Sequence, residues 1–298
     1  MDGEGGSPEM PAQVQRAKGV GRLRRVGIVL LITLVVTYVT ICVVIFATQR
    51  HLIYFPSSGY TVTPEEMGLS YEAATLTTSD GESIAAWYVS VSQPRATILF
   101  CHGNAGNMAE RCPTLKTFSR LGYDVLIFDY RGYGASTGVP SEAGLYCDAD
   151  AAWQYLTVER QIPPQRIVVF GRSLGGAVAI DLATRHTPAA LVVECTFTSM
   201  VDIGQREYPL LPVGLLCTHR YESVKKVPNL HCPKLFFHGM QDELIPLDNA
   251  RRLFAAAAEP KQFIATGGGH NEAGCEYNAA STQQLGEWLA SALTGNTP

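Results

Sequence analysis

Residues 167–180 read IVVFGRSLGGAVAI, and this stretch decides the fold that the sequence predicts. A short run that is apolar throughout leads into Gly-Arg-Ser-Leu-Gly at 171–175, and a second run with the composition of a helix follows. A strand that turns into a helix through Gly-x-Ser-x-Gly is typical of a nucleophile elbow, because its two glycines leave room for a tight, strained turn. The pattern also arises by chance in a glycine-rich chain, but the flanking strand and helix favour Ser173 as a nucleophile.

The same alternation of strand-like and helix-like runs continues from about Leu69 to Leu293. Short apolar runs separated by amphipathic stretches predict one α/β domain, 69–298, with a mostly parallel sheet and helices on both faces. Two strand-like runs around Ser79-Asp80-Gly81 predict an antiparallel hairpin at one edge of that sheet. The expected helices are Ala109–Leu121, Ala143–Val158, Leu174–Arg185, Asp248–Ala258 and Ser281–Leu293.

Residues 196–232 interrupt this alternation and include the segment YPLLPVGLLC. Their proline and apolar content is typical of an insertion over the carboxyl edge of the sheet, where open α/β sheets bind ligands. A mobile lid and a packed structural excursion both fit this composition.

A serine hydroxyl is a weak nucleophile unless a base removes its proton and an acid orients that base. Asp242 follows the apolar run 234–238, and His270 follows a strand-like QFIA across three glycines. The sequence therefore predicts a catalytic triad in the order Ser173, Asp242, His270. Glu194 and Asp129 also end strand-like runs, so both stay open as alternative acids.

An acyl-transfer site also needs hydrogen-bond donors for the oxyanion that forms in the reaction. Leu174 directly follows the nucleophile and offers its backbone N–H at the start of the helix. The second donor is expected from the loop after the strand-like ATILFC, where the sequence continues His102-Gly103-Asn104. We expect His102 to orient this loop and not to act as a second base.

A run of 23 residues without charge, Val26 to Thr48, precedes the α/β domain. An α-helix needs about 20 such residues to cross a bilayer, so the run predicts a transmembrane helix. Basic residues cluster before it and only Arg50 lies just after it, which places the N-terminus in the cytoplasm and the α/β domain on the opposite side. A cleavable signal peptide is the alternative, but its apolar region is usually about 7 to 15 residues long.

The segments on either side of this run are expected to be a tail and a connector. Residues 1–25 are rich in Gly, Pro and charge, which predicts a short disordered tail. Residues 49–68 are expected to form a juxtamembrane connector, with Tyr54 and Phe55 placed where interfacial aromatic rings are common.

Composition narrows the classes of partner and cofactor. The formal net charge is −4 and basic residues are scattered beyond the first 25 positions, so no nucleic-acid partner is expected. The eight cysteines form no C-x-x-C pair, so no metal site is predicted. Acyl transfer by a serine, a histidine and an acid implies no organic cofactor. Free thiols and a Cys217–Cys232 disulfide stay open as alternatives.

The motifs HGNAGN, DYRGYGAS, GRSLGG, HGMQDELIP and GGGH occur in this order. With them the chain resembles α/β-hydrolase-fold serine hydrolases, and it is most similar to the membrane-anchored group bearing HGNAGN and GRSLGG, whose eukaryotic relatives include protein depalmitoylases. The resemblance implies Ser173, Asp242 and His270 as catalytic residues and the N–H groups of Asn104 and Leu174 as the oxyanion hole. The depalmitoylases are anchored by a palmitoylated cysteine cluster, whereas this chain has an apolar run and no such cluster.

These observations together predict a membrane-anchored hydrolase that cleaves a carboxylic ester or thioester through an acyl-enzyme on Ser173. The substrate would be a small-molecule or acyl-protein ester, and the run 26–48 would contact the lipid bilayer. The membrane anchor and the apolar stretch Tyr208 to Leu216 suggest a lipid-like substrate, although a buried lid gives the same composition. A serine peptidase of the same fold and a non-catalytic anchored binding module are the alternatives.

Overall fold

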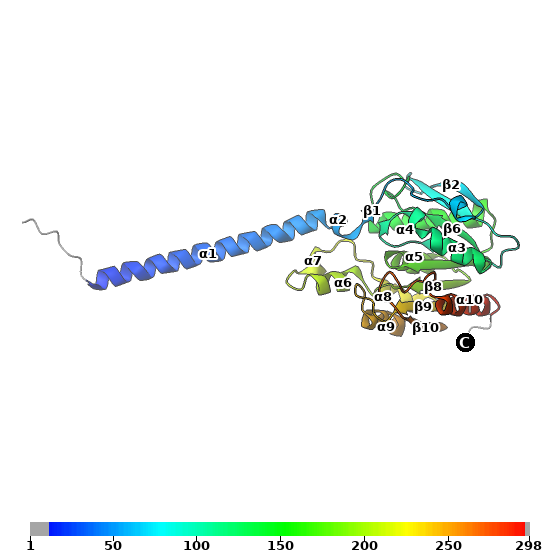
Figure 1. Ribbon diagram of the computed structural model, residues 1–298. Helices are drawn as coiled ribbons and strands as arrows, with labels where there is room; N and C mark the ends of the chain where they lie inside the picture. Colours follow the sequence, from blue (N-terminus) through cyan, green and yellow to red (C-terminus); the bar gives the residue numbers. More distant parts are fainter. Residues whose placement is uncertain (1–11, 296–298) are drawn as a thin grey trace, which may run out of the picture. The chain divides into compact units, whose positions relative to one another are not determined.

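The computed structural model describes residues 12–295, which form two units, one ending at Gln49 and the other beginning at Arg50. The first unit is a single helix, α1 (Ala12–Thr48), drawn in blue in Figure 1. Within its segment Arg22–Thr48, an 18-residue window has a mean hydropathy of 3.0. Its length and apolar composition allow this segment to span a membrane. A signal sequence near an N-terminus can have the same length and composition.

Helix α1 starts earlier than the predicted boundary at Val26. Residues 12–25, which were expected to be disordered, are helical, while residues 1–11 of the expected tail lie outside the described residues. The segment contains good helix formers such as Ala, Gln, Arg and Lys, and a helix already nucleated in the apolar run extends at little cost. The low apolar content of the tail excludes a core, but it does not exclude a helix.

The second unit is built on an eight-stranded sheet with the order β10-β9-β8-β7-β4-β6-β3-β2. The neighbours from β10 to β6 pair in parallel, whereas β3 is antiparallel to both β2 and β6. The hairpin predicted around Ser79-Asp80-Gly81 is therefore confirmed. The strands are β2 (Tyr71–Thr77), β3 (Ser83–Val89), β4 (Thr97–Cys101), β6 (Asp124–Phe128), β7 (Ile167–Arg172), β8 (Ala190–Glu194), β9 (Lys234–Gly239) and β10 (Lys261–Thr266).

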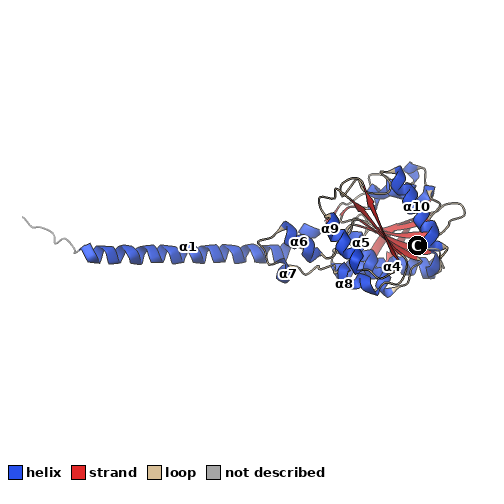
Figure 2. Ribbon diagram, turned by 90° about the horizontal axis from the view of Figure 1, so that it is seen from below, coloured by secondary structure: helices blue, strands red, loops and turns tan. Residues whose placement is uncertain are grey.

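Helices cover both faces of this sheet, as Figure 2 shows with the strands in red between blue helices. One face packs against α3 (Cys112–Arg120) and α10 (Ala279–Leu293). The other face packs against α4 (Glu142–Gln154), α5 (Leu174–Arg185), α8 (Ser223–Lys226) and α9 (Leu247–Ala256). Strands β4, β6, β7 and β8 are buried along their whole length, which explains why their sequences are apolar without alternation. The predicted fold class is confirmed.

The segment 196–232, predicted to be irregular, carries short helices. They are α6 (Met200–Glu207), α7 (Val213–Leu216), α8 and a 3₁₀ turn at Val227–Asn229. Ser199 caps α6, because its side chain accepts a hydrogen bond from the N–H of Asp202. Whether this segment moves as a lid stays a prediction.

Residues 49–68, expected to be a connector, belong largely to the second unit. Helix α2 (Arg50–Ile53) leads into β1 (Phe55–Pro56), which pairs in parallel with β5 (Ala105–Gly106). Tyr54 is only 4% exposed, and its hydroxyl lies 2.8 Å from that of Tyr221. Tyr54 is thus a core residue and not an interfacial ring, because a partner 167 positions away in the chain encloses it.

Gly175 lies in the first turn of α5 and approaches the backbone at the end of β4. A Cβ atom at this position would lie 2.0 Å from the carbonyl oxygen of Cys101 and 2.4 Å from that of His102. Both contacts are to backbone, so no side chain can move aside to relieve them. The first turn of α5 therefore lies directly against the end of β4.

We predict that Gly175→Ala lowers the free energy of unfolding by about 1–3 kcal/mol or more, because backbone must shift to admit the methyl group. Gly214→Ala in α7 is the matched control, since, apart from its two chain neighbours and the nearby backbone of its own helix, no described residue has an atom within 4 Å of the position that its Cβ would take. This control should leave the free energy of unfolding unchanged or raise it by up to about 1 kcal/mol, because alanine favours a helix more than glycine does. Urea unfolding of both variants measures the difference, and equal stabilities would contradict the packing described.

Candidate active site

Ser173 lies at the turn between β7 and α5 in a strained backbone conformation. Its φ is 53° and its ψ is −119°, a region that residues other than glycine rarely adopt. The turn is held because the Ser173 N–H donates to the Glu194 carbonyl at 2.8 Å and the Thr196 hydroxyl donates to the Ser173 carbonyl at 2.8 Å. The sharp turn predicted from Gly-x-Ser-x-Gly is present.

The structure brings the three predicted triad residues into one hydrogen-bonded line. His270 Nε2 lies 3.0 Å from Ser173 Oγ, and His270 Nδ1 lies 2.8 Å from Asp242 Oδ2. A carboxylate only accepts, so Nδ1 carries the proton and Nε2 is left to accept from the serine hydroxyl. This arrangement can draw a proton from Ser173.

Asp242 is buried and well supplied with donors. Its Oδ1 accepts backbone N–H groups from Leu244 at 3.1 Å and Ile245 at 2.7 Å. Burial alone would raise the pKa of Asp242, but the hydrogen bond from His270 and the Ile245 N–H outweigh it, so the pKa lies below its ordinary value. The carboxylate therefore stays ionised beside the imidazole.

The two alternative acids have other partners. Glu194 Oε1 lies 3.2 Å from Arg172 Nε, and its other oxygen accepts the Cys275 N–H at 3.4 Å. Asp129 accepts the Met108 N–H at 2.7 Å. The imidazole of His270 bonds to Asp242 and to neither of these carboxylates, so the geometry favours Asp242 as the acid.

A cavity of about 400 Å³ opens beside Ser173 and His270. Gly103 and the predicted oxyanion residues Asn104 and Leu174 line it next to the serine. Most of the other lining side chains are apolar, and a volume of this size is typical of small-molecule sites. The apolar residues are Leu52, Ile53, Phe55, Ala105, Phe197, Met200, Ile203, Leu244 and Ile245.

The contribution of α2 and β1 to this cavity was missed from the sequence. Leu52, Ile53 and Phe55 line the wall, and the Ile53 carbonyl accepts a hydrogen bond from Asn104 Nδ2 at 2.9 Å. Local composition gave no signal for this role, because the contacts join positions about 50 residues apart. The apolar residues of 196–232 that line the cavity agree with an insertion over the carboxyl edge.

Arg172, the residue before the serine, was also missed. Its guanidinium contacts Glu194, lies 2.7 Å from Glu276 and donates to the Asn271 carbonyl at 3.1 Å. These bonds tie the ends of β7 and β8 to the loop that carries His270. The sequence signal was an arginine directly after the apolar run 167–171, where the chain is expected to be buried. A buried charge needs partners, so this position could have suggested ion pairs with nearby carboxylates.

Two groups of side chains among residues 12–295 bring metal-ligating atoms within 4.8 Å of one another. They are Cys195, Asp242, His270 and Glu194, Cys275, Glu276. In the first group a cation would have to displace the proton between Asp242 and His270. In the second it would compete with the guanidinium of Arg172. All eight cysteines are free, so Cys217 and Cys232 form no disulfide.

The sequence is similar to several known proteins. The family model described as alpha/beta hydrolase fold matches residues 96–213. Uncharacterized protein Rv2307c of Mycobacterium tuberculosis is 39% identical over 84% of this chain and 90% of its own length. Protein bem46 of Schizosaccharomyces pombe is 36% identical over 73% of this chain and 78% of its own. Alpha/beta hydrolase domain-containing protein WAV2 of Arabidopsis thaliana is 36% identical over 71% of this chain and 76% of its own length.

The fold is also similar to solved structures. The Pyrococcus furiosus esterase Pf2001 superposes with a TM-score of 0.68 and 19% identity, covering 81% of this chain and 98% of the esterase. At that identity the likeness concerns the fold alone. The sheet order and its covering helices define the class as an α/β hydrolase. The chain belongs to the α/β-hydrolase-fold family.

The strain at Ser173 gives a prediction that does not depend on activity. Ser173→Gly and Ser173→Ala both remove the contact with His270, but only glycine adopts a positive φ without strain. We expect the glycine variant to exceed the alanine variant in free energy of unfolding by about 1 kcal/mol. Urea unfolding of the two proteins checks this, and an alanine variant as stable as the glycine variant would argue against a strained turn.

Proposed function

We propose that this α/β hydrolase is a serine esterase or thioesterase that acts through an acyl-enzyme on Ser173. The observation that carries the proposal is the line from Ser173 Oγ through the His270 imidazole to Asp242, with contacts of 3.0 and 2.8 Å. The esterase named among the structural neighbours supports the same class of reaction by fold alone.

In the proposed reaction, Ser173 Oγ attacks the carbonyl carbon of the ester while His270 Nε2 takes the hydroxyl proton. The backbone N–H groups of Asn104 and Leu174 stabilise the oxyanion. The intermediate collapses, the bond to the leaving group breaks, and His270 returns its proton to the departing alcohol or thiol. Water then attacks the acyl-enzyme with His270 as base, which releases the acid and restores Ser173.

The apolar lining of the cavity favours an apolar acyl group. Side chains from α2, β1, α6 and the loop after β9 enclose the space next to Ser173, and most of them carry no polar atom. Burial of an acyl chain there is favourable by roughly 0.8 kcal/mol for each CH₂ group. We therefore propose a lipid-like or acyl-protein ester of the kind that the depalmitoylase-type relatives suggest.

Two substitutions test the catalytic roles. Ser173→Ala should lower kcat/KM for an aryl ester by more than about 10⁴-fold, because the nucleophile is lost. Asp242→Asn should lower it by about 10⁴-fold, because an amide that donates to His270 Nδ1 leaves the proton on Nε2. The kcat/KM of both variants is measured on purified protein, and unfolding curves check that each variant is folded. Full ester hydrolysis by Ser173→Ala would contradict the proposal.

We further propose that residues 26–48 anchor the protein as a single-pass helix, with the N-terminus in the cytoplasm and the hydrolase domain on the other side. The apolar segment ending at Thr48 and the basic cluster before Val26 support this orientation.

The anchor predicts that full-length protein stays in the membrane pellet after alkaline carbonate extraction. Protease added to intact cells or spheroplasts should cleave the hydrolase domain while an N-terminal tag stays protected. Recovery in the carbonate supernatant would refute the anchor. Digestion of the tag with protection of the domain would refute the orientation.

A further inference from the structure

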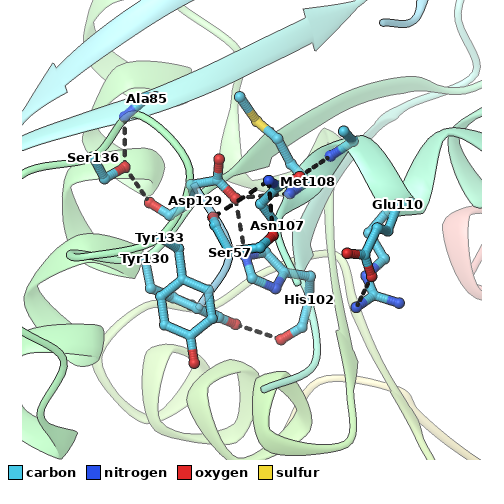
Figure 3. A network of polar contacts seen from close by, with 12 residues as sticks. Ser57, Ala85, His102, Asn107, Met108, Glu110, Asp129, Tyr130, Tyr133 and Ser136 are labelled. Atoms are coloured by element: carbon cyan, nitrogen blue, oxygen red, sulfur yellow. Dashed lines mark hydrogen bonds and ion pairs between the residues drawn. The ribbon is translucent and has the colours of Figure 1, made fainter. Parts of the chain in front are cut away.

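A second buried His–Asp pair consists of His102, which directly follows β4, and Asp129, and Figure 3 shows both side chains. Both side chains are fully buried, and His102 Nε2 lies 3.5 Å from Asp129 Oδ1. His102 does not line the cavity, and the hydroxyl of Ser173 bonds to His270 instead, so His102 is not a second base for the serine. Its role must lie in the loop that follows β4.

The imidazole of His102 fixes one peptide plane of that loop. His102 Nδ1 lies 2.7 Å from the Gly103 carbonyl oxygen. A carbonyl oxygen and a carboxylate oxygen only accept, so Nδ1 carries a proton that it donates to Gly103, and the pair with Asp129 requires a second proton on Nε2. The Gly103–Asn104 peptide is trans, so its N–H points away from its C=O. Holding the Gly103 oxygen toward His102 therefore directs the Asn104 N–H to the opposite side.

Asp129 connects this imidazole to the neighbouring strand. It directly follows β6 and accepts the Met108 N–H at 2.7 Å and the Tyr60 hydroxyl at 2.9 Å. Its own backbone N–H donates to the Ala85 carbonyl at 2.9 Å. One carboxylate thus contacts the loop at both ends, through His102 at its start and Met108 at its close.

Other donors fix the remaining freedom of the loop. The Asn104 carbonyl accepts from the Tyr133 hydroxyl at 2.7 Å and from the Phe55 N–H at 3.0 Å. The His102 carbonyl accepts from the Tyr130 hydroxyl at 2.8 Å. These bonds hold the peptides on either side, whereas the His102 side chain holds the carbonyl that shares a peptide plane with the Asn104 N–H.

We propose that His102, supported by Asp129, is a positioning residue that aims the Asn104 N–H at the oxyanion through the Gly103 carbonyl. This inference rests on the proposed function, because it assumes an oxyanion beside Ser173. It predicts that His102 acts on the transition state and leaves binding of the uncharged substrate unchanged.

A matched pair of substitutions separates the two ring nitrogens. The amide nitrogen of His102→Asn reaches the place of Nδ1 and can still donate to Gly103, whereas that of His102→Gln reaches toward the place of Nε2 and Asp129. We expect His102→Gln to lower kcat by about 10- to 100-fold with KM unchanged, which is less than the roughly 10²- to 10³-fold for loss of a donor. His102→Asn should keep most of the activity.

Affinity for an alkyl boronic acid supplies a readout that a purely structural role would not move. Its adduct with the serine places a charged oxygen where the oxyanion forms, so its Ki should rise in His102→Gln by the same factor as kcat falls. Affinity for an alkyl ether analogue of the substrate should not change. His186→Asn is the control, because His186 pairs with Asp150 at 2.7 Å and stacks on Trp153, away from the loop.

Asp129→Asn provides a second test, because Asp129 acts on the Gly103–Asn104 peptide through His102. It should lower kcat in the wild-type background but cause little further loss in His102→Gln, because both act on one peptide. Equal losses in His102→Asn and His102→Gln, an unchanged boronate Ki, or additive losses with Asp129→Asn would each overturn the inference. Ester hydrolysis by Ser173→Ala would instead overturn the proposed function itself.

Discussion

The close approach of Gly175 to the carbonyl oxygens at the end of β4 is the constraint on which the site depends. No side chain could stand at this position, because a Cβ would lie 2.0 Å from the Cys101 oxygen. The contact holds the start of α5, and with it Ser173 and Leu174, against the strand that leads into the Asn104 loop. The serine and both expected oxyanion donors therefore lie around one cavity although they come from separate parts of the chain.

Two His–Asp pairs contribute to the proposed site, and we assign them different roles. The pair His270–Asp242 reaches the serine directly and is suited to move its proton. The pair His102–Asp129 is buried and is suited to hold a peptide still. Electrostatic catalysis benefits from donors fixed before the reaction begins, because no energy is then spent on reorganisation as charge develops.

The sequence predicted correctly those elements whose structure depends on neighbouring residues, such as turns and helices. Helix α5 has the predicted bounds, Leu174–Arg185, because a strained turn begins it and the apolar run after it has helical propensity. The β2–β3 hairpin follows from its turn residues. The roles of Tyr54 and of the α2 residues beside the cavity could not be predicted, because partners that are distant in sequence create them. The start of α1 at Ala12 shows that composition without apolar content still permits a helix.

The central claim is that an acyl group is transferred to Ser173, and mass spectrometry of a rapidly quenched reaction with an aryl ester tests it most directly. The account predicts an adduct with the mass of the acyl group on the peptide that contains Ser173, formed at a rate consistent with turnover. Turnover without an adduct at Ser173 under these conditions, or an adduct on another residue that forms and decays at the turnover rate, would contradict the account.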